Sequence, residues 1–189
     1  MLGTLADSFD FMVRSFIANL PFVLWCLAAL WVIHFINFSL KYRLNAFGIL
    51  PRKLIGLPGI ILSPLLHGHA THLLFNTLPL FILMSLVLMA GKSHFYAVTV
   101  YVVLISGAAT WLMGRRAIHI GASGLAMGYW GYLLITAIRD PSIMTIALGV
   151  LCLYYLGSMV ANLFPLDAKS SWEGHVFGFL AGVGVSFFL

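Results

Sequence analysis

Long apolar stretches, interrupted by short groups of polar, glycine and proline residues, make up most of this chain. A helix needs about 20 mostly apolar residues to cross the hydrocarbon core of a bilayer. The pattern predicts six spans, at about residues 15–40, 69–89, 93–113, 123–138, 142–161 and 175–189. Because we find neither an internal repeat nor a linker, we expect a single domain over residues 1–189. The predicted fold class is an all-α membrane protein built as a six-helix bundle.

The segment at residues 41–66 departs from this pattern, because it is apolar but contains Pro51, Pro58 and Pro64 together with four basic residues. Proline interrupts helices, so the segment is too broken for a span. It is also too apolar to be freely solvated, and we expect it to lie partly immersed in the membrane interface. The first span is much longer than the core of a signal peptide and is expected to remain in the mature protein.

Composition excludes several other classes of protein. Of the 189 residues 62% are apolar and 8% are charged, whereas soluble domains carry roughly 25% charged residues. A soluble domain, a disordered chain and a protein that binds nucleic acid through a basic surface are therefore not expected. Cys26 and Cys152 lie in apolar runs, so no disulfide is predicted.

The formal charge of +5 comes from ten scattered basic residues, and their distribution bears on orientation. With six spans, both termini lie on one side of the membrane, together with Arg14, Lys92 and Arg139. The opposite side holds the remaining basic residues, which are Lys41, Arg43, Arg52, Lys53, Arg115, Arg116 and Lys169. Basic residues favour the cytoplasmic side, so this count places the termini outside.

Four polar side chains are expected at one depth in the membrane. His72 and Asn76 fall in the first turns of the second span, Ser123 opens the fourth and His175 opens the sixth. These three spans all begin on the same side, and a rise of about 1.5 Å per residue leaves the side chains in one shallow layer. Polar groups inside spans are costly, so each is a candidate functional residue.

Small residues at helical spacing indicate that the fourth and sixth spans pack closely. The glycines at spacings of three and four are Gly124, Gly128 and Gly131 in the fourth span, and Gly174, Gly178 and Gly182 in the sixth. Glycine at this period lets helix backbones approach each other in lipid. A contact between Ser123 and His175 is therefore predicted.

Each residue also has an ordinary structural interpretation when taken alone. A serine at a helix start is commonly an N-cap, and a histidine near a helix end commonly bonds a carbonyl. His67, His69 and His72 could form a metal site, but no cysteine or carboxylate stands nearby to complete it, and we predict neither a metal nor a cofactor. A transporter would show broken helices near mid-span and often a repeat, which we do not detect.

Three motifs together resemble the rhomboid family of intramembrane serine proteases. They are the run from His67 to Asn76 (His-Gly-His-Ala-Thr-His-Leu-Leu-Phe-Asn), Gly121-Ala-Ser123-Gly124 with Gly128, and Gly174-His175-Val-Phe-Gly178. The similarity extends over about residues 47–189. It implies a six-helix bundle, a Ser–His dyad and a water-filled cavity open to the non-cytoplasmic face. It also implies that both termini lie in the cytoplasm, which is opposite to the orientation given by the count of basic residues. A bacterial cytoplasmic membrane suits so compact a protein.

The resemblance also implies roles for single residues. Ser123 is the expected nucleophile and His175 the general base, while His72, Asn76 and the Ser123 backbone N–H stabilise the oxyanion. Gly121 keeps the approach to the nucleophile tight, and Gly124 and Gly178 support close packing. His67 is expected to make a structural hydrogen bond that supports the first loop. The substrates would be transmembrane helices of other membrane proteins, which must unwind locally before cleavage.

The chain departs from the family pattern at two places, and three further questions stay open. Met127 stands where many members have an aromatic residue, and the first loop offers Arg52-Lys53 in place of a Trp-Arg pair. The polar segment 162–174 is a hypothetical lid over the cavity. Glu173 or Asp167 could orient His175, although Glu173 points elsewhere on an ideal helix. The remaining alternative is an inactive rhomboid-like protein that only binds membrane helices.

Overall fold

The computed structural model describes residues 5–139, 141, 145–146, 149–150 and 171–189 of the chain. The long helices in these ranges are α1 (Leu5–Ser39), α3 (Ala70–Val87), α4 (Lys92–Met113), α5 (Ser123–Arg139) and α7 (Trp172–Val185). Shorter helical turns are η1 (Arg43–Phe47), η2 (Leu54–Gly56), α2 (Gly59–Leu62), η3 (Ser63–Leu65) and η4 (Leu88–Ala90). Within the described ranges the chain forms no strand beyond an isolated bridge between Ile49 and His119.

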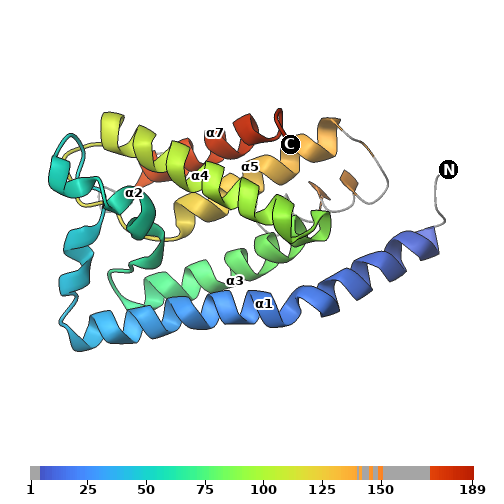
Figure 1. Cartoon of the computed structure of the whole chain (residues 1–189), viewed down its shortest axis with the longest axis horizontal. Helices are drawn as coiled ribbons and strands as arrows, with labels where there is room; N and C mark the ends of the chain where they lie inside the picture. The colour runs from blue at the N-terminus through green and yellow to red at the C-terminus, as the bar shows by residue number, and fades with distance from the viewer. Residues whose placement is uncertain (1–4, 140, 142–144, 147–148, 151–170) are drawn as a thin grey trace.

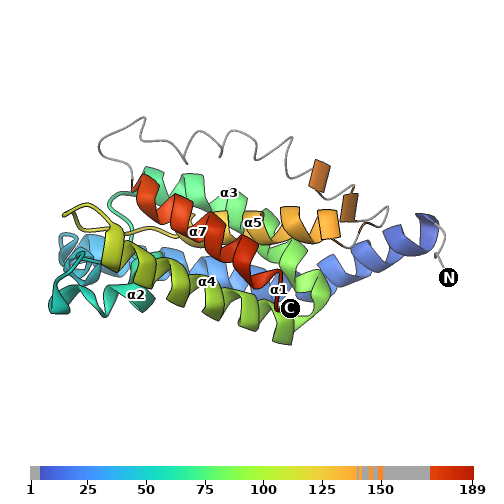
Figure 2. The same ribbon diagram turned by 90° about the horizontal axis from the view of Figure 1, so that it is seen from above.

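The helices pack side by side, with α1 along one edge of the molecule and in contact with α3 (Figure 1). On the other side α5 packs most closely against α7, and α4 covers both of them. Figure 2 shows the same bundle from above, with α7 lying along α4 and α5. The core between the helices is apolar and includes Leu73, Leu80, Leu83, Val102 and Met127, each fully or almost fully buried. The starts of α3, α5 and α7 lie at the same end, beside α2 (Figure 1).

Three helical segments in the described part of the chain are long and apolar enough to cross a membrane. They are Ala6–Ser39, Ala70–Ala90 and Lys92–Met113. The chain is therefore a helical integral membrane protein. At 17 and 14 residues, α5 and α7 are shorter than these segments, and most of the fifth predicted span, 142–161, falls outside the described residues. Six spans thus remain a prediction.

Two helix starts differ from the sequence-based boundaries. α1 is described from Leu5, ten residues before the first predicted span, and Arg14 Nε in this added part lies 2.8 Å from Asp10 Oδ2 one turn earlier. α7 begins at Trp172 and ends at Val185, so His175 lies one turn inside the helix and not at its first residue. The backbone N–H of His175 is thereby bonded to the Ser171 carbonyl at 3.4 Å.

The segment at residues 41–66 forms short helical turns that are attached to the end of α4. Arg52 donates its backbone N–H to the Trp111 carbonyl at 2.9 Å, and Trp111 Nε1 donates to the Lys53 carbonyl at the same distance. Leu54 and Ile55 on this segment are more than 70% exposed. Such exposed apolar side chains suit the interfacial position predicted for the segment, which stays a prediction.

Candidate active site

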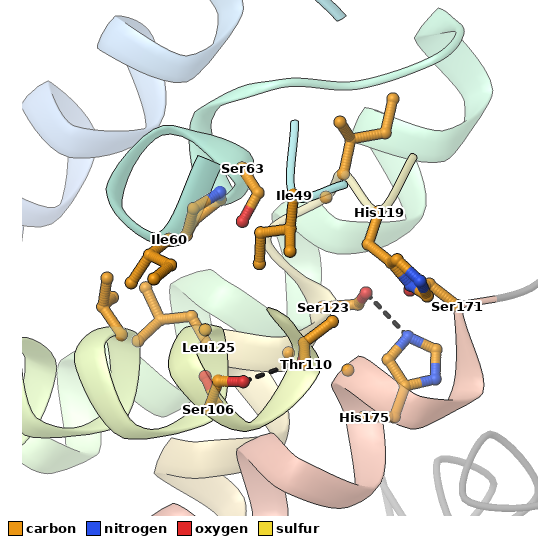
Figure 3. A pocket seen from close by; sticks show the side chains of 17 residues that line it. Ile49, Ile60, Ser63, Ser106, Thr110, His119, Ser123, Leu125, Ser171 and His175 are labelled. Atoms are coloured by element: carbon orange, nitrogen blue, oxygen red, sulfur yellow. Dashed lines mark hydrogen bonds between the residues drawn. The ribbon is translucent and has the colours of Figure 1, made fainter. Parts of the chain in front are cut away.

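Ser123 and His175 meet where α5 and α7 begin. The distance between Ser123 Oγ and His175 Nε2 is 2.7 Å, which is a hydrogen bond (Figure 3). Ser123 is the first residue of α5, so its backbone N–H has no acceptor within the helix. His175 is 8% exposed, and both side chains border one small cavity. The contact predicted from the two glycine patterns is therefore present in the structure.

The close approach of α5 and α7 at this point depends on their glycines. A Cβ at Gly124 would lie 3.0 Å from the Gly174 carbonyl oxygen. One turn further, a Cβ at Gly178 would lie 2.1 Å from the Gly124 carbonyl oxygen, which is far too close for two non-bonded atoms. The backbones of the two helices thus touch directly, which brings the side chains of Ser123 and His175 within bonding distance.

The loop before Ser123 turns sharply at Gly121, whose φ is +122°. Its backbone N–H donates to the Ser63 carbonyl at 2.9 Å, which fixes the loop to the 41–66 segment. A Cβ at Gly121 would lie 3.0 Å from His72 Nε2 and 3.6 Å from Ser123 Oγ. The missing side chain therefore leaves space between Ser123 Oγ and the imidazole of His72.

Gly121→Ala should lower the rate at which Ser123 reacts with a fluorophosphonate on the order of 100-fold, since small displacements at a reacting centre have effects of this size. Alanine at this φ costs about 1–3 kcal/mol of backbone strain, and its methyl group would push against the His72 ring. Labelling rates of the purified variants measure the effect. Gly68→Ala is the matched control, because its Cβ would meet only Ile120 Cδ1 at 3.9 Å. Equal losses in both variants would contradict the role of Gly121.

His67 connects Asn76 to the loop before Ser123. Its Nε2 lies 3.1 Å from Asn76 Nδ2 and accepts a hydrogen bond from the Ala122 backbone N–H at 3.3 Å. Because both partners are donors, Nε2 is the acceptor nitrogen and the ring hydrogen resides on Nδ1. Asn76 uses one of its two amide hydrogens here, so the other can serve a different acceptor.

The imidazole of His67 is fully buried, and this burial, together with the nearby imidazoles of His72 and His34, lowers its pKa to about 3. The unfolded chain takes up a proton at this side chain below about pH 6.5, whereas the folded protein does not. The free energy of unfolding should therefore be insensitive to this group above pH 6.5 and fall by about 1.4 kcal/mol per pH unit below it.

Denaturant unfolding in micelles at pH 7.5 and pH 5.0 measures this dependence. In His67→Gln the side-chain oxygen takes the place of Nε2 without titrating, so the difference between the two pH values should shrink. The same pH dependence in the wild type and in His67→Gln would show that His67 is not responsible.

His72 and His69 lie at the start of α3. His69 is the N-cap, and its Nδ1 accepts the His72 backbone N–H at 3.0 Å. The His72 ring lies between the rings of His67 and His69, with centroid distances of 5.1 and 5.7 Å. In the described part of the chain, no three histidine, cysteine or acidic side chains form a group that could hold a metal ion.

A cavity of about 40 Å³ extends from the dyad toward α4 (Figure 3). Its polar lining includes Ser63, Ser106 and Thr110 beside Ser123 and His175. A water molecule needs at least about 10–15 Å³ and a few polar partners, so the cavity is large and polar enough for water next to Ser123.

The acidic residues and the proposed lid differ in what the structure shows of them. Glu173 is buried, and its Oε1 accepts the Arg115 backbone N–H at 3.3 Å, which directs it to the loop before Ser123. Asp167 and residues 162–170 of the hypothetical lid lie outside the described residues. Met127 is fully buried in the core.

Sequence reasoning missed one residue near the dyad. None of the sequence motifs includes His119, yet it is 3% exposed, lines the cavity and bonds through both ring nitrogens. The available signal was a histidine two residues before Gly121, but its partner, Ser171, is 52 residues away in the sequence.

The part of the chain that forms this site is similar to known proteins. A family model described as Rhomboid domain matches residues 56–189. An uncharacterised protein of Mycobacterium tuberculosis is 34% identical over 176 residues, which cover 88% of this chain and 73% of that protein. An uncharacterised protein of Mycobacterium leprae is 32% identical over 176 residues, with coverages of 88% and 70%. The range matched by the family model contains both residues of the dyad.

Proposed function

Because the chain belongs to the rhomboid family of intramembrane proteases, we propose that it is a serine endopeptidase that cleaves transmembrane helices of other membrane proteins. The observation that carries this proposal is the 2.7 Å contact between Ser123 Oγ and His175 Nε2 beside a polar cavity. A serine hydroxyl is a weak nucleophile at neutral pH unless a neighbouring base accepts its proton. The contact supports His175 as such a base for Ser123.

In the proposed reaction, Ser123 Oγ attacks the carbonyl carbon of the scissile peptide bond as its proton passes to His175 Nε2. The imidazolium then donates that proton to the leaving amine, and the acyl group stays on Ser123. A water molecule from the adjoining cavity, deprotonated by His175, attacks the acyl carbon and releases the second product. The serine recovers its proton and the dyad is restored.

The developing oxyanion requires hydrogen-bond donors. Three are proposed: the His72 ring beside Gly121, the second amide hydrogen of Asn76, and the Ser123 backbone N–H at the start of α5. Donors that are already fixed by the fold need little reorganisation when charge develops. The bond between Asn76 and His67 fixes one of them in this way.

His72→Ala and Asn76→Ala should each lower kcat by roughly 100- to 1,000-fold, the range found when one oxyanion donor is removed. KM should change little, because the donors act on charge that appears only in the transition state. Steady-state cleavage of a labelled substrate helix separates the two constants. Asn19→Ala is the control, since Asn19 bonds the Ser15 carbonyl within α1. A rise in KM with unchanged kcat would assign these residues to substrate binding.

The proposed substrates are transmembrane helices with small residues near the cleaved bond. A helical peptide bond is shielded by its own backbone hydrogen bonds, so a segment must unwind before Ser123 reaches it. The proposed location is a bacterial cytoplasmic membrane, with the end that contains the starts of α3, α5 and α7 on the non-cytoplasmic side. No metal, cofactor or nucleic acid enters the proposed reaction.

The test is cleavage of single-span helices by the purified protein in proteoliposomes, with the products identified by mass. We expect one cut within or next to the hydrophobic span of helices that contain small residues. Well-folded protein that cuts none of several such helices, and whose Ser123 does not react with a fluorophosphonate, would instead support a protein that only binds membrane helices.

A further inference from the structure

His119 lies in the loop 114–122, between α4 and Ser123, and makes hydrogen bonds through its backbone and through both ring nitrogens. Its backbone exchanges two hydrogen bonds with Ile49, at 2.9 and 3.0 Å. Its ring Nε2 lies 3.1 Å from the Arg115 carbonyl, and its Nδ1 is bonded to the hydroxyl of Ser171. A carbonyl can only accept, so Nε2 carries the hydrogen in the neutral ring and Nδ1 accepts from Ser171.

Ser171 connects this ring to the helix of the general base. It is the N-cap residue of α7, but its side chain makes no capping bond to the helix. A serine cap contributes typically about 1 kcal/mol to helix stability, and here the hydroxyl is directed across to His119 instead. The Ser171 carbonyl accepts the backbone N–H of His175 at 3.4 Å. Figure 3 shows His119 and Ser171 side by side next to His175.

A second contact joins the same two segments. Glu173 Oε1 accepts the Arg115 backbone N–H at 3.3 Å and lies 3.6 Å from Arg115 Nε. The side chain of Glu173 is 6% exposed, so water weakens this ion pair less than one at the surface. The start of α7 is thus attached at two points, Ser171 and Glu173, to the loop that leads into Ser123.

We propose that His119 is a positioning residue for the dyad, which holds the first turn of α7, and with it His175, against the loop before Ser123. In many serine hydrolases a third group bonded to the base fixes its orientation. Here His119 acts on the backbone of the helix that carries the base. The proposal rests on the proposed function of Ser123 and His175. It adds a residue that acts through the helix carrying the base.

The test compares substitutions at His119 that keep or remove the bond to Ser171. His119→Leu removes it, whereas the side chain of His119→Asn places an oxygen near the position of Nδ1. The readout is the second-order rate at which a fluorophosphonate modifies Ser123, per folded protein, over pH 5 to 9. This small probe reports on the dyad without requiring a substrate helix.

His119→Leu should lower the labelling rate on the order of 10- to 100-fold, as expected for a displaced base, and flatten its dependence on pH. His119→Asn should regain most of the rate. Ser171→Ala should match His119→Leu, and the double variant should agree with either single variant within about twofold. Kinetics with a substrate helix should show the loss in kcat and not in KM. Ser186→Ala, which removes a buried hydroxyl at the other end of α7, is the control and should label as the wild type does.

The outcomes separate this inference from the proposed function. A wild-type Ser123 that neither reacts nor cleaves overturns both. A reactive wild type with unchanged rates in His119→Leu and Ser171→Ala overturns the positioning role alone, as does an equal loss in His119→Leu and His119→Asn. If His119→Leu fails to fold, Ser171→Ala decides the matter, because it removes a single oxygen atom.

Discussion

Ser123→Ala and His175→Ala should each abolish cleavage of a transmembrane helix, with losses on the order of 10⁶-fold in kcat. The reason is that the nucleophile and its base act as one unit. Without His175 the Ser123 hydroxyl keeps its proton, and without Ser123 the imidazole has no acyl acceptor beside it. Cleavage in proteoliposomes, followed by gel and mass analysis over hours to days, measures the residual rate.

The double variant Ser123→Ala/His175→Ala should be no slower than either single variant, because each already removes the whole unit. Ser85→Ala is the serine control, since that hydroxyl donates to the Phe81 carbonyl within α3. Binding of the substrate helix should persist in all variants, because each substitution changes only one or two side chains at the site. Cleavage that survives Ser123→Ala would identify a different nucleophile.

Gly182→Ala and Gly178→Ala should destabilise the folded protein by at least about 3 kcal/mol each, the upper part of the range for overpacked cores. A Cβ at Gly182 would lie 1.8 Å from the Gly128 carbonyl oxygen, and one at Gly178 2.1 Å from that of Gly124. Both clashes are with backbone of α5, which no change of rotamer relieves. The helices must separate, and His175 then moves away from Ser123. Unfolding in mixed micelles measures the loss, together with fluorophosphonate labelling of the protein that remains folded.

Gly184→Ala on the same helix is the matched control. Its Cβ would lie 3.5 Å from the Tyr101 hydroxyl, an ordinary contact, and alanine is the better helix former. This variant should therefore be as stable as the wild type or slightly more stable. If Gly182→Ala were equally well tolerated, the direct backbone contact between α5 and α7 would be wrong.

The sequence by itself determined the class of the protein and predicted the residues of the candidate site. Apolar runs of spanning length indicate a helical membrane protein because a bilayer leaves few other ways to satisfy the backbone. The family motifs name Ser123, His175, His72 and Asn76, and the glycine periods of the fourth and sixth spans predict which helices touch. These features are local or periodic, so they can be read from the order of residues.

Only the tertiary structure decided where helices begin and which distant residues bond. α1 extends back to Leu5, beyond the apolar stretch from which its span is predicted, and the start of α7 at Trp172 leaves His175 one turn inside the helix. The bond between His119 and Ser171 is not periodic and joins two loops 52 residues apart. Such contacts arise when packing brings segments together, since a hydrogen bond between side chains depends on ångström-scale placement that no local pattern encodes.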